Sequence, residues 1–266
     1  MSRLAGLFSE LKNQGRKALV PYIVAGDPTQ EITLPLMHEL VAKGADILEI
    51  GVPFSDPMAE GPVIQLAHER ALANHTSLSK TLEIVSAFRK DNQTTPVVLM
   101  GYTNPVERMG YSEFAKRATA AGVDGLLTVD LPPEEASELS AILAEAGIDN
   151  IFLLAPTSTD ERIAQTAALA SGYLYCVSLK GVTGAGHLDV EAVKAQMDKI
   201  RAHTDLPVTV GFGIKDGASA SAVAPHCEGV VVGSALVESI AASSTDAAKL
   251  AACELIADIR KAIDSI

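Results

Sequence analysis

The sequence has few cysteines, no cluster of basic residues and no long apolar run, and each shortage excludes a class of protein. Its three cysteines are an odd number, lie far apart and form no C-x-x-C pair, which argues against a disulfide framework and a zinc site. No run of five lysines and arginines occurs, and the net charge of −12 disfavours nucleic acid or an anionic membrane as the main partner. No apolar stretch is long enough to cross a membrane, so we expect a cytoplasmic protein.

Length and composition favour one large domain. The chain has 266 residues, 48% of them apolar, and no low-complexity linker, so we predict a single domain over residues 1–266. Near the N-terminus, Leu4, Leu7, Phe8 and Leu11 form an amphipathic pattern, which predicts an extra helix packed on a core rather than a signal sequence. The acidic charge still allows a small anionic substrate, because backbone amides can bind phosphate without lysine or arginine.

Apolar runs alternate with helical patterns eight times along the chain. Continuous apolar character is typical of strands covered on both faces, and a helix between successive strands makes their pairing parallel. Eight such units, with no G-x-G-x-x-G after a strand, favour an α/β fold of the closed (β/α)8 TIM-barrel type over an open dinucleotide-binding sheet. The predicted strands are Leu19–Ala25, Asp46–Ile50, Val97–Gly101, Gly125–Val129, Ile151–Leu154, Tyr173–Val177, Val208–Gly211 and Gly229–Val232.

Two connections are longer than a barrel requires. About fifty residues separate the starts of the second and third strands, which leaves room for an extra helix beside the usual one. After the sixth strand, the segment Ser178–His187 reads SLKGVTGAGH and contains three glycines. A flexible loop over a barrel mouth is the expected form of a lid, and a plain solvent loop is the alternative.

Chemistry in a TIM barrel lies at the carboxyl ends of the strands. One predicted strand carries Glu49 inside an apolar run, and a carboxylate there is costly to bury without a partner or a function. An ion pair within the core is the alternative explanation. Past the seventh and eighth strands, GFGIKDG and VVGSAL place glycines just ahead of a helix, where free N–H groups can hold a phosphate.

A set of longer motifs then points to a family. The chain contains, in order, EIGVPFSDPMAEGPVIQ, GYTNP, VDLPPEE, LLAPTS, SLKGVTGA, VGFGI and VVGSALV. Together these motifs resemble the tryptophan synthase alpha subunit family from Leu4 to about Ile263. The resemblance implies a carbon–carbon lyase of tryptophan biosynthesis that cleaves indole-3-glycerol phosphate into indole and glyceraldehyde 3-phosphate by a retro-aldol reaction.

The resemblance also implies two catalytic carboxylates. Glu49 matches the general acid/base that protonates indole C3 and manages the glycerol hydroxyl, and an apolar barrel mouth should raise its pKa. Glu60 stands where the family motif S-D-P-x-A-D-G-P usually has aspartate, and it would hold the indole N–H. Its extra methylene leaves the reaction class intact but puts full turnover in question, because a misplacement of about 1 Å can cost about a hundredfold. The alternative for Glu60 is a solvated loop glutamate, with Asp56 carrying a structural network.

The remaining assignments from the resemblance concern binding. Thr183 matches a lid residue that contacts the second carboxylate, and the partner is a beta subunit, in an α2β2 heterotetramer, that carries the pyridoxal phosphate. No cofactor and no metal are expected in this chain. The indole pocket would be formed by Tyr22, Met100, Tyr102, Leu127, Leu153, Tyr175 and Phe212, the phosphate site by Gly184, Gly213, Gly233 and Ser234, and the partner interface by Pro53, Asp56, Asn104, Asp130 and Pro132.

Two other functions are compatible with parts of the sequence. A Schiff-base aldolase could use Lys180, which follows the sixth strand, although a lysine in a glycine-rich loop lacks the desolvated setting that such an amine needs. The other is a barrel that mainly binds and activates the beta subunit, with chemistry weakened by Glu60.

Overall fold

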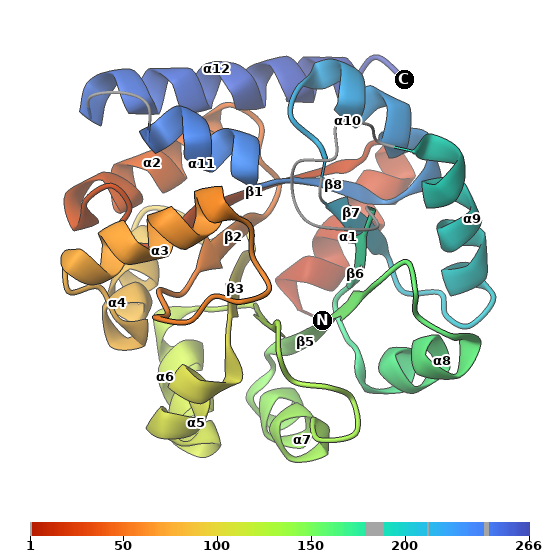
Figure 1. Cartoon of the computed structure of the whole chain (residues 1–266), viewed down its shortest axis with the longest axis horizontal. Helices are drawn as coiled ribbons and strands as arrows, with labels where there is room; N and C mark the ends of the chain where they lie inside the picture. The colour runs from red at the N-terminus through yellow and green to blue at the C-terminus, as the bar shows by residue number, and fades with distance from the viewer. Residues whose placement is uncertain (1, 179–188, 212, 242–244) are drawn as a thin grey trace.

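Eight parallel strands close into the predicted barrel. The computed structural model describes residues 2–178, 189–211, 213–241 and 245–266. The strands pair in chain order and β8 pairs with β1, and Figure 1 shows the helices arranged around this ring. All eight predicted strands are confirmed, with ends within two residues of the prediction. They are β1 (Ala18–Val24), β2 (Leu48–Gly51), β3 (Val97–Gly101), β4 (Gly125–Thr128), β5 (Asp149–Leu154), β6 (Leu174–Val177), β7 (Val208–Gly211) and β8 (Gly229–Val232).

The helices confirm both additions predicted for the barrel. A helix precedes β1, and two helices lie between β2 and β3, where the sequence leaves room for an extra one. Within the described residues, no helix is long and apolar enough to span a membrane. The helices are α1 (Arg3–Gln14), α2 (Gln30–Ala42), α3 (Pro62–Ala73), α4 (Leu78–Phe88), α5 (Thr103–Met109), α6 (Tyr111–Ala121), α7 (Ser137–Ala146), α8 (Asp160–Leu169), α9 (Val190–Arg201), α10 (Gly217–Val223), the 3₁₀ turn η1 (Ala224–His226), α11 (Ser234–Ala241) and α12 (Thr245–Ile263).

The first helix covers the amino end of the barrel. Leu4 and Phe8 of α1 are buried, and the Phe8 ring packs on the Tyr173 ring with 5.7 Å between centroids. A side chain added at Gly125, the first residue of β4, would meet Leu4. In Figure 1 this helix projects against the middle of the ring of strands, unlike the helices around it. The amino end is therefore filled, and the carboxyl end remains for a site.

Strand residues alternate between two buried layers. Leu19 and Ile23 of β1 pack outward against the helices, whereas Tyr22 joins the inner cluster that fills the barrel. Tyr22 pairs in register with Glu49 of the neighbouring strand. Because alternate residues share a face, the carboxylate that the sequence places inside an apolar run lies with the inner layer, next to Tyr22 and Tyr175.

The motif Gly-x-Asp recurs between a helix and the next strand, at residues 44–46, 122–124 and 147–149, and it has a structural role. Gly122 ends α6 in the left-handed conformation, and a Cβ there would lie 2.7 Å from the Arg89 side chain. Two residues on, Asp124 accepts the Val97 N–H at 2.8 Å and pairs with Arg89 at 2.6 Å. Asp46 does the same for β1, whose backbone it binds at 2.8 Å. These acidic residues fix the amino ends of the strands, away from the open mouth.

Candidate active site

Glu49 projects from β2 into the barrel, and it is fully buried. Neither of its carboxylate oxygens has an aligned hydrogen-bond partner, and no described lysine, arginine or histidine lies within ion-pair distance. The alternative of a core ion pair is therefore not observed among the described residues. An unpaired carboxyl group in the apolar interior is held in its neutral form more readily than in water.

The surroundings of Glu49 shift its proton affinity strongly. Burial raises the pKa of Glu49 to about 8, the Tyr173 hydroxyl beside it lowers the pKa in part, and the negative charge of Glu60 raises it again. The Tyr173 hydroxyl and the carboxylate are not aligned as a regular hydrogen bond. With a pKa of about 8, roughly nine in ten molecules carry a protonated Glu49 at pH 7. The group is an acid ready to donate at neutral pH.

Glu60 lies in the connection between β2 and α3 and is also buried, at 8% exposure, unlike a solvated loop glutamate. Its Oε2 lies 3.0 Å from Nε2 of His68, and neither of its oxygens has an aligned hydrogen bond. Glu60 acts electrostatically on both Glu49 and Tyr22. The two carboxylates therefore belong to one site inside the same end of the barrel.

Tyr22 lies between the two carboxylates and Gly233, one of the residues predicted to bind phosphate. A Cβ added at Gly51 would lie 2.3 Å from the Tyr22 hydroxyl, so the absence of a side chain there makes room for the phenol. At the backbone end of the same side chain, a Cβ added at Gly233 would lie 3.9 Å from Tyr22 Cβ. Gly233 and the two carboxylates therefore all lie near the Tyr22 side chain, at the same end of the barrel. Burial, Glu60 and Glu49 raise the pKa of Tyr22 well above its usual value, so the phenol is neutral.

The other residues predicted for an indole pocket line the inner layer where they are described. Met100, Leu127 and Tyr175 are buried there, and Leu153 is half-buried at its margin. Tyr102 is buried too, and its hydroxyl accepts the Ala59 N–H at 3.1 Å, which holds the chain next to Glu60. Phe212, Thr183, Gly184 and Lys180 lie outside the described residues.

The predicted phosphate residues that are described lie at two neighbouring strand ends. Gly213 follows β7 with φ +79°, in the left-handed region that favours glycine. Gly233 follows β8, and Ser234 begins α11, whose first-turn N–H groups have no partners within the helix. These positions are suited to an anion.

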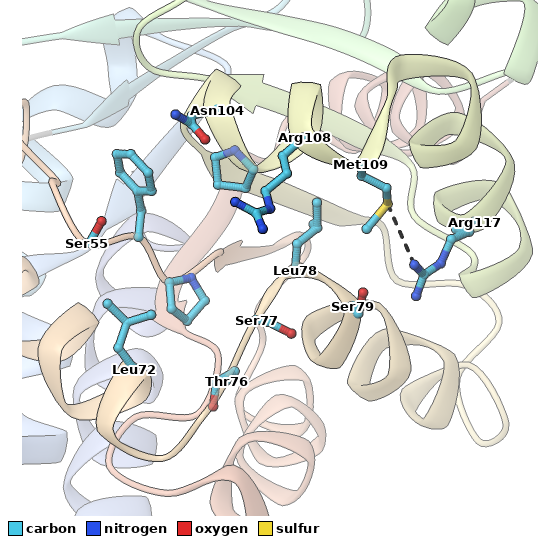
Figure 2. A pocket seen from close by; sticks show the side chains of 13 residues that line it. Ser55, Leu72, Thr76, Ser77, Leu78, Ser79, Asn104, Arg108, Met109 and Arg117 are labelled. Carbon is cyan, nitrogen blue, oxygen red and sulfur yellow. Dashed lines mark hydrogen bonds between the residues drawn. The ribbon is translucent and has the colours of Figure 1, made fainter.

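The residues predicted for a partner interface divide into two groups. Pro53 and Asn104 line a groove of about 500 Å³, together with Phe54 and Arg108, and Figure 2 shows Arg108 directed from α5 into it. Asp56, Asp130 and Pro132 are not among its lining residues. Asp130 instead accepts the backbone N–H and the hydroxyl of Thr103 at 2.7 and 2.9 Å, and so caps the start of α5.

Two residues of the site, His68 and Tyr173, were not predicted from the sequence. His68 lies on the buried face of α3 with Ile64, Ala67 and Ala71. A histidine at a core position of an amphipathic helix is unusual, and this could have indicated a functional residue. Tyr173 stands two residues before Tyr175, and the alternation of a strand puts both on the inner face.

Comparisons with known proteins agree with one another. The family model described as tryptophan synthase alpha chain matches residues 8–263. The tryptophan synthase alpha chains of Methylococcus capsulatus and Thioalkalivibrio sulfidiphilus are 56% and 58% identical to this chain, covering 100% and 99% of it and 100% of each relative. The crystal structure of tryptophan synthase subunit alpha from Legionella pneumophila superposes with a TM-score of 0.92 at 45% identity, with 100% of both chains covered. Mycobacterium tuberculosis tryptophan synthase gives 0.89 at 37% identity over 98% of each chain.

Proposed function

The chain belongs to the tryptophan synthase alpha chain family, and on that premise we propose that Glu49 and Glu60 carry out its reaction. It is a carbon–carbon lyase of tryptophan biosynthesis, and the alpha reaction cleaves indole-3-glycerol phosphate into indole and glyceraldehyde 3-phosphate. The proposal concerns which residues perform the steps, how the substrate is held and with what partner the barrel works.

A pair of buried, unsatisfied carboxylates carries the proposal. All four oxygens of Glu49 and Glu60 lack an aligned hydrogen-bond donor, and a buried acceptor without a donor costs about 1–3 kcal/mol. A ligand that brings donors into the mouth recovers part of that cost. The indole N–H and the glycerol hydroxyls are such donors, and the apolar inner layer around them suits an indole ring.

The two acids have different tasks because their surroundings differ. Protonated Glu49 gives its proton to indole C3, and the positive charge that develops at the ring nitrogen is stabilised by the Glu60 carboxylate. The Glu49 carboxylate then takes the proton of the hydroxyl on the attached glycerol carbon. As that carbon becomes an aldehyde, the electrons of the C3–carbon bond return to the ring and indole leaves. Glu49 has then regained its proton, and no net charge is left behind.

We propose that the substrate phosphate binds at the ends of β7 and β8. Gly213, Gly233 and Ser234 form the described part of this site, and Gly184 is kept as a predicted fourth member. The support is the set of free N–H groups at the start of α11 and the position of Gly233 beside Tyr22, on whose hydroxyl both acids act electrostatically. Thr183 keeps its predicted place in a lid that contacts Glu60.

We also propose that the groove between α5 and the start of α4 is part of the docking surface for a beta subunit. Its lining combines Pro53 and Phe54 with the cation of Arg108, a mixture of apolar contact and charge that suits a protein partner. Family membership supports a beta-subunit partner. An α2β2 assembly, pyridoxal phosphate confined to the partner, a cytoplasmic location and a single-domain chain complete the proposal.

Indole release from indole-3-glycerol phosphate tests the proposed chemistry. We expect the wild-type chain to release indole and glyceraldehyde 3-phosphate in equal amounts, faster with a beta subunit present. Glu60→Gln keeps the size of the side chain but removes its charge, and should lower kcat by about 10²–10³-fold. Glu60→Asp shows whether the longer side chain limits turnover. A wild-type chain that stimulates a beta subunit but releases no indole would be the activating barrel instead.

A further inference from the structure

A buried histidine of α3 has no place in the steps above. His68 is 1% exposed, and its Nε2 lies 3.0 Å from Oε2 of Glu60. The Phe54 backbone N–H donates to its Nδ1 at 3.0 Å, and the Tyr22 hydroxyl lies 3.4 Å from its Nε2. Both ring nitrogens are therefore engaged, and one of them faces the carboxylate assigned to the indole nitrogen.

The Phe54 contact determines which ring nitrogen carries the proton. A backbone N–H can only donate, so Nδ1 of His68 must accept and cannot itself be protonated. The single proton of the neutral ring then lies on Nε2, which has the Tyr22 hydroxyl at 3.4 Å and Oε2 of Glu60 at 3.0 Å, the latter not aligned as a regular hydrogen bond. In a doubly protonated ring, the N–H at Nδ1 would face the Phe54 N–H, and two donors cannot form a hydrogen bond with each other. His68 thus has its N–H on the ring nitrogen that lies nearest to Glu60.

The rest of the connection holds the backbone at Glu60 but leaves its side chain free. The Gln65 amide donates to the Glu60 carbonyl at 2.7 Å, and Tyr102 accepts the preceding N–H, from Ala59, at 3.1 Å. Neither contact restrains the three rotatable bonds of the glutamate side chain, one more than aspartate has. Only His68 among the described residues lies within ion-pair distance of the carboxylate itself.

We propose that His68 is the positioning residue of Glu60. Its neutral ring, oriented by the Phe54 N–H, offers Nε2–H to Oε2 of Glu60, 3.0 Å away, and a small rotation of the Glu60 carboxylate would align this bond and leave Oε1 to accept the indole N–H. This inference rests on the proposed function, because it takes Glu60 as the acceptor of that N–H. It adds a reason why a glutamate can serve at this position: the longer side chain is held at its far end by a residue of α3.

Two substitutions separate the two nitrogens of the ring. In His68→Gln the amide nitrogen stands as many bonds from Cα as Nε2 does, so a donor toward Glu60 is kept and the acceptor for Phe54 is lost. In His68→Asn the amide oxygen corresponds to Nδ1, so the Phe54 bond is kept, but the amide nitrogen is one bond short of the Nε2 position and the donor there is lost. His38→Asn is the matched control, since His38 packs its ring on Phe88 in the outer layer, 4.8 Å between centroids.

Steady-state indole release and urea unfolding of these variants test the proposal. We expect His68→Asn to lose about 10- to 100-fold in kcat with little change in KM, and His68→Gln to stay within about fivefold of wild type. The stabilities should rank the other way, with the Gln variant less stable, because its Phe54 N–H is unpaired. His38→Asn should keep the wild-type kcat. The opposite activity order, or equal activity of both His68 variants, would overturn the proposal.

A second background covers the case in which the Gln variant does not fold. Aspartate at position 60 is shorter by one methylene, so we expect its carboxylate to lose contact with Nε2. In Glu60→Asp the His68→Asn change should therefore lower kcat less than threefold, compared with about 10-fold or more in the wild-type background. An equal loss in both backgrounds would refute the positioning role. Absence of indole release from the wild type would refute the proposed function itself, whereas an active wild type with an unimpaired His68→Asn variant would refute only the inference.

Discussion

The pKa of Glu49 makes the stability of the barrel depend on pH in a way that one substitution can isolate. The folded-state value is about 8, against 4.5 for an ordinary glutamate, so between pH 4.5 and 8 the folded chain holds a proton that the unfolded chain has lost. Folding is then disfavoured as pH rises, by about 1.4 kcal/mol per pH unit. The stabilising contribution is complete below pH 4.5 and is lost as pH rises to about 8.

Glu49→Gln removes this dependence while it keeps the size of the side chain. Over 3.5 pH units, the free energy of unfolding of the wild type should fall relative to that of the variant by on the order of 5 kcal/mol. This is an upper limit, since at high pH the ionised carboxylate can turn toward water. Other titrating groups largely cancel because they are common to both proteins.

Urea unfolding at a series of pH values measures the difference. The sequence contains no tryptophan, so circular dichroism is the appropriate signal, and the difference between the two proteins should grow steadily from pH 5 to pH 8 and then level. Glu145→Gln, at an exposed position on α7, provides a control with no such trend. A difference between wild type and Glu49→Gln that stays constant with pH would refute the buried, protonated state assigned to Glu49.

Three further outcomes follow from the contacts around the site. Tyr173→Phe removes a hydroxyl that lowers the pKa of Glu49, so the alkaline limb of the kcat/KM profile should move to higher pH. A hydrogen bond of about 1 kcal/mol corresponds to a shift of somewhat less than one pH unit. An alkaline limb that does not move would show that the hydroxyl has no influence on Glu49. Arg89→Ala removes one of the cations that pair with the buried Asp124. The free energy of unfolding in urea should fall by about 3 kcal/mol, while kcat of the folded fraction at 25 °C stays unchanged. A decrease below about 1 kcal/mol would contradict this prediction. Phe54→Ala removes an aromatic ring from the docking groove. Calorimetric titration with a beta subunit should then show affinity lower by about tenfold or more. Unaltered affinity would exclude the groove from the interface.

The architecture could be predicted because local and global signals agree. Strands buried on both faces read as continuous apolar runs, and Gly122 with Asp124 marks a helix end and a strand start together. The seven-residue α5 escaped prediction, since a short segment such as Thr103–Met109 gives too little periodicity to separate it from the next helix. The exact ends of the strands could be predicted only to within one or two residues, because they depend on individual hydrogen bonds between strands that no local sequence pattern specifies.

The site could be predicted only in part. Glu49 was visible because a carboxylate inside an apolar run is unusual, and family resemblance added Glu60. The role of His68 depends on a hydrogen bond from Phe54, fourteen residues away in the chain, and no local pattern specifies which nitrogen that bond engages. Asp130 likewise caps α5 through a contact across 27 residues and does not line the docking groove, and no local pattern specifies either.

The pH profile of indole release by wild type and Glu49→Gln tests the central claim most directly. We predict that kcat/KM of the wild type falls as pH rises through about 8, when Glu49 loses its proton. Glu49→Gln should be slower by about 10²–10⁴-fold, without that alkaline limb. A Glu49→Gln variant that keeps the wild-type rate and the wild-type profile would contradict the account, because cleavage would then proceed without the acid to which it is assigned.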